Sequence, residues 1–232
     1  MAKKKISRKE LLKKPDEFLT FSARAILYAR QHAGKLKLLG AVVVAAILVY
    51  AGTNTYLKYV DKKGQETYNA AYNRLIKGLQ GEKPNLEELA KSEQLFRKVM
   101  DEYGLSKSSG LALAELGYIK FTKGEYDEAI SLYSSYMEEI SGDWYYKSLA
   151  ILALGACYEA KGDVRKAVDV LEPTSAGPGS FLKGQAMLGL SRLYELMGRD
   201  DRAEKVLEEF SEMFPSSPYL PFVRARLNSY DQ

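Results

Sequence analysis

The chain has 232 residues, with 34 Lys or Arg, 30 Asp or Glu and a single cysteine. One cysteine excludes an internal disulfide, so cysteine usage does not indicate the redox compartment. The net charge of +4 is uneven, because residues 1–37 contain eleven basic and three acidic residues and the remaining 195 residues sum to −4. Without an aromatic stacking platform or a recognition motif, this basic segment favours anionic lipid over nucleic acid as its contact.

Residues 1–37 are predicted to be a basic cytoplasmic tail. Met1 to Lys14 is a charge run that suits a disordered segment or one lying on lipid headgroups. Pro15 and Asp16 indicate a helix start, and the next apolar residues fall roughly on one face, which favours a short interfacial helix. A poorly ordered tail is the alternative. The apolar residues of that face are Phe18, Leu19, Ala25, Ile26 and Ala29.

Residues 38–57 read LLGAVVVAAILVYAGTNTYL and carry no formal charge. Twenty helical residues span roughly 30 Å, the thickness of a bilayer's hydrocarbon core, so the segment predicts one transmembrane helix. A buried core helix and a cleaved signal peptide are the alternatives. The 37 preceding residues exceed a signal peptide's short basic region. Small residues at Ala41, Ala45 and Gly52 would permit close approach of another helix, and we expect them to form the anchor's binding face.

The orientation of this predicted anchor follows from flanking charge. The eleven basic residues of the tail favour an N-terminus in the cytoplasm, with residues 58–232 outside it. Close to the segment the bias is small, because residues 18–37 contain four basic side chains and residues 58–77 contain five.

Beyond the anchor the apolar period is helical, with no alternation typical of strands, so the chain is predicted to be all-α. A helix is expected to continue from the membrane until the sequence Gly-Glu-Lys-Pro at 81–84 ends it, and a second is expected over about 86–103. We interpret residues 58–104 as a degenerate copy of the repeat that the following part of the sequence contains.

The sequence after residue 104 contains three copies of one pattern. The middle copy contains Ile151, Leu154-Gly155, Tyr158, Gly162, Ala167, Leu171 and Pro173. The first copy aligns Leu113, Leu116-Gly117, Lys120, Gly124, Ala129 and Tyr133, and the third aligns Met187, Leu190-Ser191, Tyr194, Gly198, Ala203, Leu207 and Pro215. These spacings resemble the tetratricopeptide repeat, whose unit of roughly 34 residues carries W-x2-L-G-x2-Y, a turn glycine, A-x3-F and a late proline.

The resemblance implies an α-solenoid of three to four helix hairpins. Its repeats would cover about 110–147, 148–183 and 184–217, followed by a capping helix at 218–230 that covers the last apolar face. Glycines at 117 and 155 would let paired helices approach closely, those at 124, 162 and 198 would form tight turns, and alanines at 129, 167 and 203 would lie at close helix contacts. Lys120 stands at a tyrosine position, Ser191 stands at a glycine position, and no copy has the tryptophan. Thr174 to Ser180 is expected to be an inter-repeat loop.

Residues that could carry catalysis are few. His32 is the single histidine and lies on the tail side of the anchor, whereas Cys157 lies in the repeats, so no Cys-His pair or metal site is expected. From Gly179 to Gly184 the glycine spacing matches a P-loop, but Gln185 and Ala186 stand where Lys and Ser or Thr are required. We therefore expect no enzyme activity, cofactor, metal or small-molecule substrate.

Protein binding is the predicted function, because stacked helix pairs form a curved surface that recognises extended peptides or partner proteins. Packing against adjacent helices is the alternative role for Tyr118 and Phe121. The Lys and Asn that clamp a chaperone-tail carboxylate have no counterpart, so capture of an acidic C-terminus is not expected. The groove positions implied by the resemblance are Ala114, Tyr118, Phe121, Leu152, Ala156, Glu159, Leu188, Arg192 and Glu195.

Basic tail, single anchor and repeat domain together resemble the single-pass ancillary subunit of the bacterial Sec translocon. The resemblance implies an inner-membrane protein with its repeats in the periplasm. Its partners would be translocon subunits, exported proteins or periplasmic chaperones. A scaffold for envelope assembly or cell division is one alternative, and a regulatory membrane protein that signals through its tail is another.

Overall fold

The computed structural model describes residues 17–140, 144–176 and 181–230, which form ten helices and no strand. The predicted all-α fold is therefore confirmed. Two compact units, Met1–Tyr56 and Leu57–Gln232, contain these helices. Three sequence interpretations lie outside the described residues: the charge run of Met1 to Lys14, the helix start at Pro15 and Asp16, and the glycine-rich loop at 177–180.

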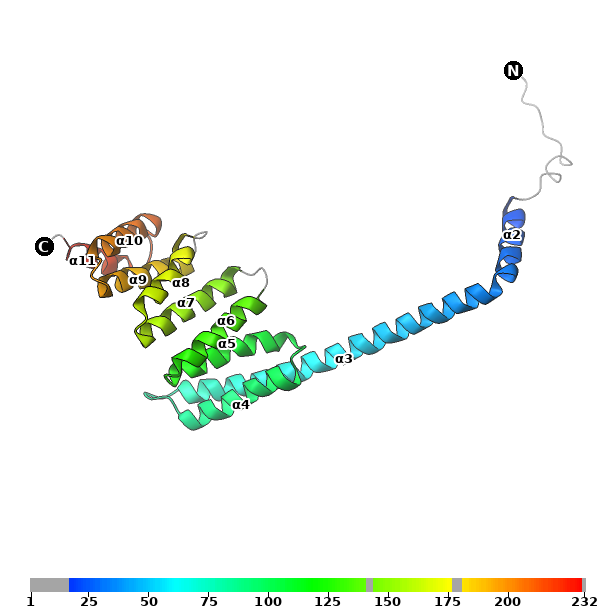
Figure 1. Ribbon diagram of the computed structural model, residues 1–232, viewed down its shortest axis with the longest axis horizontal. Coiled ribbons are helices and arrows are strands. Elements are labelled where there is room, and N and C mark those ends of the chain that lie inside the picture. The colour runs from blue at the N-terminus through cyan, green and yellow to red at the C-terminus, as the bar shows by residue number, and fades with distance from the viewer. Residues whose placement is uncertain (1–16, 141–143, 177–180, 231–232) are drawn as a thin grey trace, which may run out of the picture. The chain divides into compact units, whose positions relative to one another are not determined.

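The first unit contains α2 (Glu17–Gln31) and the N-terminal part of α3 (Ala33–Leu79) (Figure 1). The two helices are separated at His32, whose backbone N–H donates to the Tyr28 carbonyl oxygen at 3.0 Å. The rings of these two residues stack with centroids 4.3 Å apart. α2 covers the segment for which an interfacial helix is predicted, and its contact with a membrane stays a prediction.

Helix α3 is long and apolar enough to cross a membrane, and it is the one such helix among the described residues. None of its most apolar stretch is buried within the structure. Tyr50, for example, is 74% exposed. The helix continues past Leu57 to Leu79, as the sequence predicts.

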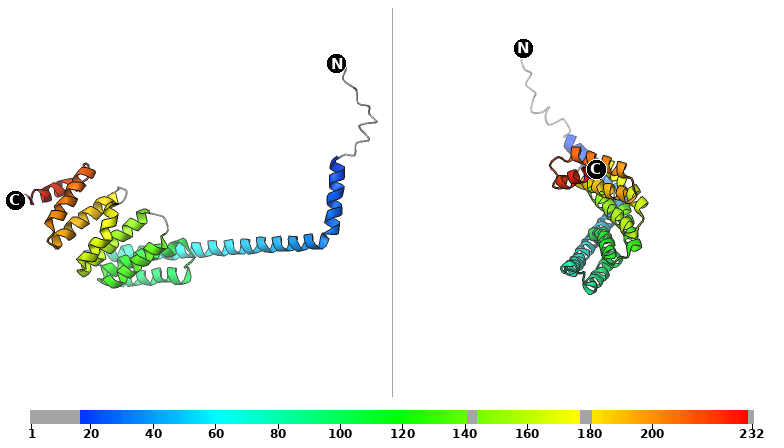
Figure 2. Two further views of the ribbon diagram at one scale, coloured as in Figure 1. Left: turned by 45° about the horizontal axis from the view of Figure 1, so that its top comes forward. Right: turned by 90° about the vertical axis from the view of Figure 1, so that its left-hand side faces the viewer.

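The second unit is a stack of antiparallel helix pairs (Figures 1 and 2). From α4 onward each helix contacts the next along the chain, so the stack follows sequence order. Four pairs and a terminal helix confirm the predicted solenoid of three to four hairpins with a cap. The C-terminal part of α3 pairs with α4 (Leu86–Glu102), α5 (Lys107–Thr122) with α6 (Tyr126–Glu139), α7 (Trp144–Lys161) with α8 (Val164–Ala176), and α9 (Phe181–Leu196) with α10 (Asp200–Met213), before α11 (Leu220–Leu227).

The first pair packs α3 against α4. Leu75 and Phe96 lie in their shared core, and the Ser92 hydroxyl donates to the Ala71 carbonyl oxygen at 2.8 Å. α4 begins at Leu86 because the Asn85 side chain accepts hydrogen bonds from two first-turn backbone N–H groups.

The repeat glycines and alanines lie where the sequence places them. Gly124, Gly162 and Gly198 have φ angles of +78°, +88° and +67°, in the left-handed region that favours glycine. A Cβ atom at Gly117 would lie 2.9 Å from the Tyr133 ring, and one at Gly155 would lie 2.8 Å from Leu171. The paired helices therefore approach closely, as predicted. Three alanines at equivalent positions are fully buried: Ala129, Ala167 and Ala203.

The end of α8 differs from the sequence interpretation. Pro173 lies inside the helix, which continues to Ala176, so Thr174 is helical rather than part of a loop. Thr174 is 3% exposed. Burial of this side chain gives the helix tertiary packing beyond the proline, which local propensity does not predict.

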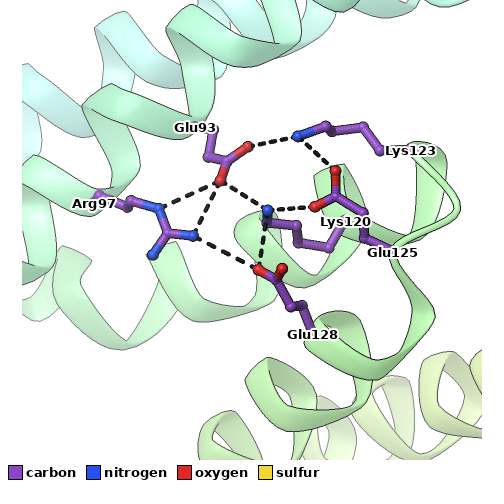
Figure 3. A network of polar contacts seen from close by, with 6 residues as sticks. All are labelled: Glu93, Arg97, Lys120, Lys123, Glu125 and Glu128. Atoms are coloured by element: carbon purple, nitrogen blue, oxygen red, sulfur yellow. Dashed lines mark hydrogen bonds and ion pairs between the residues drawn. The ribbon is translucent and has the colours of Figure 1, made fainter.

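Lys120 occupies the position at which the repeat pattern has a tyrosine, and its side chain is nearly fully buried. Figure 3 shows its amino group among three carboxylates, with Nζ 3.0 Å from both Glu93 and Glu128 and paired also with Glu125. Burial lowers the pKa of the lysine, but the hydrogen bonds to the three carboxylates raise it further than burial lowers it. The side chain therefore joins α4, α5 and α6 as a charged cation.

Two more cations complete this network around Glu93 (Figure 3). Arg97 Nη2 lies 3.0 Å and Lys123 Nζ 3.1 Å from the Glu93 carboxylate. Burial raises the pKa of Glu93, but hydrogen bonds from Lys120, Arg97 and Lys123 outweigh it and hold the pKa at about 2. The network contains three cations and three carboxylates, so its charges balance within the fold.

Candidate protein-binding groove

Two cavities lie along the first helices of the pairs, and together we call them the groove. The N-terminal cavity lies between α5 and α7, and the C-terminal cavity lies between α9 and α11. Equivalent repeat positions line both, because Leu111 and Ala114 of the first correspond to Gln185 and Leu188 of the second. The two cavities therefore occupy the same face of the repeats.

The C-terminal cavity has a volume of about 650 Å³. It contains three of the residues predicted for the groove, which are Leu188, Arg192 and Glu195. Phe222 of α11 also lines it and is 65% exposed. The remaining lining residues are Gln185, Ser191, Leu207, Tyr219 and Arg226.

Arginines pair with two carboxylates here, Glu195 of the cavity lining and Glu159 one repeat earlier. Arg192 Nε and Nη2 donate to the two oxygens of Glu159 at 2.8 and 2.6 Å. One repeat later, Arg226 Nε donates to Glu195 at 2.7 Å, and the Tyr230 hydroxyl also bonds Glu195. The hydrogen bond from Arg226 lowers the pKa of Glu195 more than burial raises it. Each carboxylate thus has a cation from the next first-helix position.

The N-terminal cavity is smaller, about 380 Å³, and differs in its lining. One carboxylate, Glu115, lies among tyrosines from three helices, α3, α6 and α7. The tyrosines are Tyr68, Tyr133, Tyr136 and Tyr146, and the aliphatic residues are Leu111, Ala114, Leu149, Ala150 and Ala153.

Glu115 is half-buried and is held by the Tyr68 hydroxyl, which donates to Oε1 at 3.0 Å. Within the described part of the chain, no Lys, Arg or His lies within ion-pair distance of this carboxylate. Burial raises the pKa of Glu115, and the Tyr68 bond only partly opposes it. Burial likewise raises the pKa values of Tyr68 and Tyr133, so both hydroxyls remain protonated at neutral pH.

Ala114, another predicted groove residue, lines the N-terminal cavity. The remaining five line neither cavity: Tyr118, Phe121, Leu152, Ala156 and Glu159. Tyr118 is 42% exposed on α5. Phe121 is half-buried, packs against the cluster that includes Ala129 and Cys157, and lies with its ring 5.6 Å from that of Tyr126. Leu152 packs against the core formed by α8 and α9. Phe121 and Leu152 thus pack within the fold, and their role in binding stays a prediction.

The sequence did not predict Glu115, Tyr68, Tyr146 or Leu149 for the groove. Glu115 directly follows the predicted position Ala114, and Leu149 stands at the position equivalent to Leu111, so repeat register provides a weak signal for both. No sequence signal links Tyr68 with Glu115, because 47 residues separate them.

Other candidate residues are placed as follows. Ala41, Ala45 and Gly52 lie exposed on α3, and their role as an anchor face stays a prediction. Cys157 is fully buried, and burial raises its pKa to about 11, so the thiol is protonated at neutral pH. The described residues contain no group of three or more His, Cys, Asp or Glu side chains suited to a metal ion.

Two similar solved structures support the fold. Two crystal structures of nearly identical TPR-like repeats from a putative kinesin light chain of Podosopora anserina, one of them a point variant, each match with 16% identity and a TM-score of 0.56. Each match covers 72% of this chain and 84% of the other. PcrH in complex with the chaperone binding region of PopB matches with 19% identity over 54% of this chain and 97% of that chain, with a TM-score of 0.44.

A search of curated proteins finds no match. Two family profiles do match the sequence. The profile described as a tetratricopeptide repeat-like domain covers residues 33–186, and one described as a tetratricopeptide repeat covers 185–217. Together with the stacked helix pairs, their turn glycines and their buried alanines, these matches show that the chain belongs to the tetratricopeptide repeat-like family of protein–protein interaction scaffolds.

Proposed function

We propose that this protein is a membrane-anchored scaffold that binds extended segments of other proteins in its groove. The observation that carries the proposal is the N-terminal cavity, whose lining is mostly aromatic and aliphatic. Leu111, Tyr146 and Leu149 line this cavity and are nevertheless exposed. Exposed apolar side chains beside a cavity are typical of surfaces that bind protein partners.

The anchor in this proposal is the N-terminal part of α3. Residues 38–57 carry no charge, and the most apolar stretch of the helix is entirely unburied. The core helix of a soluble protein would instead be covered by its own fold. Lipid is the medium that suits such a surface. The basic tail then favours a cytoplasmic N-terminus and an extracytoplasmic repeat domain.

The partner class in this proposal is exported protein. A groove with exposed tyrosine and leucine suits apolar segments of chains that have crossed the membrane and not yet folded. The order of basic tail, apolar helix and repeats supports a place beside the Sec translocon, from which such chains pass to periplasmic chaperones. The cavity of about 380 Å³ has room for individual side chains of an extended segment.

Site-specific photocrosslinking in cells tests the partners. A photoreactive residue at Leu149 should crosslink exported proteins or a periplasmic chaperone, and one at Val43 should crosslink a translocon subunit. Glu208 is exposed on α10 and provides the matched control position, at which these adducts should be absent. Adducts with one envelope-assembly or division protein at Leu149, and with lipid alone at Val43, would instead assign the protein to that assembly.

Protease accessibility tests the topology. Protease added to spheroplasts should digest residues 58–232 and leave the N-terminal tail intact. Lysed cells provide the control in which both parts are cleaved. Protection of the repeats in intact spheroplasts would reverse the orientation and rule out the translocon assignment.

A further inference from the structure

We propose that the N-terminal cavity binds a cationic side chain, Lys or Arg, of the extended segment in the groove. This inference rests on the proposed function and specifies its partner: a polypeptide that presents a basic residue between apolar ones. Glu115 would receive the cation, and the tyrosines of the cavity would surround it.

Glu115 has fewer hydrogen-bond donors than its carboxylate can accept. Its Oε1 accepts from the Tyr68 hydroxyl at 3.0 Å, which fixes the carboxylate at the cavity wall. A tyrosine hydroxyl supplies one neutral donor, whereas a carboxylate has about four acceptor sites. Among the residues that the structure describes, no cation supplies the rest. A half-buried carboxylate in this state gains from a charged donor that enters the cavity with a partner.

Elsewhere in the domain, arginines provide such carboxylates with charged hydrogen-bond donors. Glu159 receives two hydrogen bonds from Arg192, and Glu195 receives one from Arg226. In both cases the arginine comes from the next repeat position along the stack. One repeat earlier, the equivalents of Glu159 and Arg192 are Phe121 and Ala156, so this ion pair is absent there. Glu115 stands at a different repeat position, equivalent to Ala153 and Gly189, and no cation of the described residues pairs with it.

The remaining lining of the cavity also suits a basic side chain. Tyrosine rings attract cations through their π faces, and four tyrosines line this cavity. Leu111 and Leu149 would contact the aliphatic stem of Lys or Arg while the charged end reaches Glu115. An acidic side chain or a C-terminal carboxylate would instead place a second negative charge beside Glu115. The cavity therefore selects by charge sign.

The test measures binding of short fluorescent peptides to the full chain in detergent micelles. The peptides contain Leu, Ser and Gly and differ only at one central residue, which is Lys, norleucine or Glu. We expect the Lys peptide to bind roughly tenfold more tightly than the norleucine peptide, and the Glu peptide to bind most weakly. Raising the salt concentration should reduce the preference for Lys over norleucine.

Variants locate this preference at the cavity. Glu115→Gln keeps the shape of the side chain and should reduce the Lys preference to less than about twofold by weakening Lys-peptide binding. Tyr146→Leu, a second variant at an exposed cavity wall, should weaken Lys binding more than norleucine binding. Glu208→Gln on α10 removes a carboxylate outside the cavity lining and should leave all three affinities unchanged. Circular dichroism checks that each variant is folded.

The outcomes separate this inference from the function on which it rests. Equal binding of the Lys and norleucine peptides, or a Lys preference that survives Glu115→Gln in a folded protein, would overturn the cation site while leaving a peptide-binding groove. Tightest binding of the Glu peptide would overturn it as well. Failure of all three peptides to bind would contradict the proposed function itself.

Discussion

Beside and within the C-terminal cavity, Glu159 and Glu195 each bind an arginine from the first helix of the next pair or from α11, whereas in the N-terminal cavity Glu115 binds only the hydroxyl of Tyr68 among the described residues. The two ends share their packing, because the same turn glycines and buried alanines recur in both. The difference therefore lies in the side chains of one face. It shows how a repeat protein can vary its binding chemistry from one repeat to the next without changing its fold.

The shared packing gives the largest predicted effect. Ala167 is fully buried in the core between α7, α8 and α9, so Ala167→Arg overpacks a close helix contact and buries an unpaired charge. We expect the free energy of unfolding to fall by at least about 3 kcal/mol, measured by urea denaturation of the full chain in detergent. The exposed neighbour Asp169→Arg is the control. An unchanged transition for Ala167→Arg would show that the repeat register is wrong.

The next largest loss of stability is expected from substituting Lys120, the buried cation of the N-terminal half. Lys120→Met leaves the carboxylates of Glu93, Glu125 and Glu128 without their shared partner. Breaking a fully buried ion pair costs roughly 3–5 kcal/mol, and we expect about 2 kcal/mol here because Glu128 is 59% exposed. Urea denaturation measures the loss. Lys98→Met, at an exposed pair with Glu102, should change stability by less than about 0.5 kcal/mol.

Acid titration checks the same network. The folded state holds the pKa of Glu93 at about 2, below its ordinary value of 4.5. Its contribution to stability is therefore present above pH 4.5 and is lost as the pH falls toward 2. Lys120→Met should flatten this part of the curve of unfolding free energy against pH. The substitution removes the hydrogen bond that lowers the pKa of Glu93 the most. A curve identical to that of the parent protein would contradict this assignment.

Cys157 lies on α7, a helix that lines the N-terminal cavity. Because the side chain is fully buried and its pKa is about 11, the thiol should resist alkylation at neutral pH until the domain unfolds. Cys157→Ser should cost only about 1 kcal/mol, the cost of burying a hydroxyl, and leave peptide binding intact. Alkylation of the native protein as fast as of the urea-unfolded protein would contradict the burial.

The smallest expected effects come from substituting one carboxylate at each end of the groove, Glu195 and Glu115. Glu195 has a lowered pKa, so its contribution to stability is present above its ordinary range and is lost as the pH falls. Glu115 has a raised pKa, so its contribution is present below its ordinary range and is lost as the pH rises through the folded-state value. At neutral pH, Glu195→Gln should therefore lower the melting temperature, and Glu115→Gln should raise it or leave it unchanged. In each variant the free energy of unfolding should change by less than about 1 kcal/mol.

Thermal melts of both variants at neutral and acidic pH measure this comparison. At a pH well below the ordinary range of glutamate, both variants should match the parent protein more closely. A melting temperature lowered equally by both substitutions at neutral pH would mean that Glu115 is neutralised in the free protein, and the difference between the two ends would disappear.

The repeat fold can be predicted from local features of the sequence. Turn glycines at 124, 162 and 198, small residues at helix contacts, and an uncharged apolar run are each readable from a few neighbouring positions. They determine backbone conformation and the closeness of helix pairs through sterics that do not depend on distant residues. The register of the predicted groove positions follows from the same pattern.

The side chains that meet in the groove are known only from the tertiary structure. The bond between Tyr68 and Glu115 joins different repeats, as do the pairs of Glu159 with Arg192 and of Glu195 with Arg226. Whether Phe121 is exposed or half-buried depends on the size of its neighbours on adjacent helices. A cavity forms where side chains of several helices leave space between them. Such a space depends on packing among residues far apart in the chain, which the periodicity of any single helix does not encode.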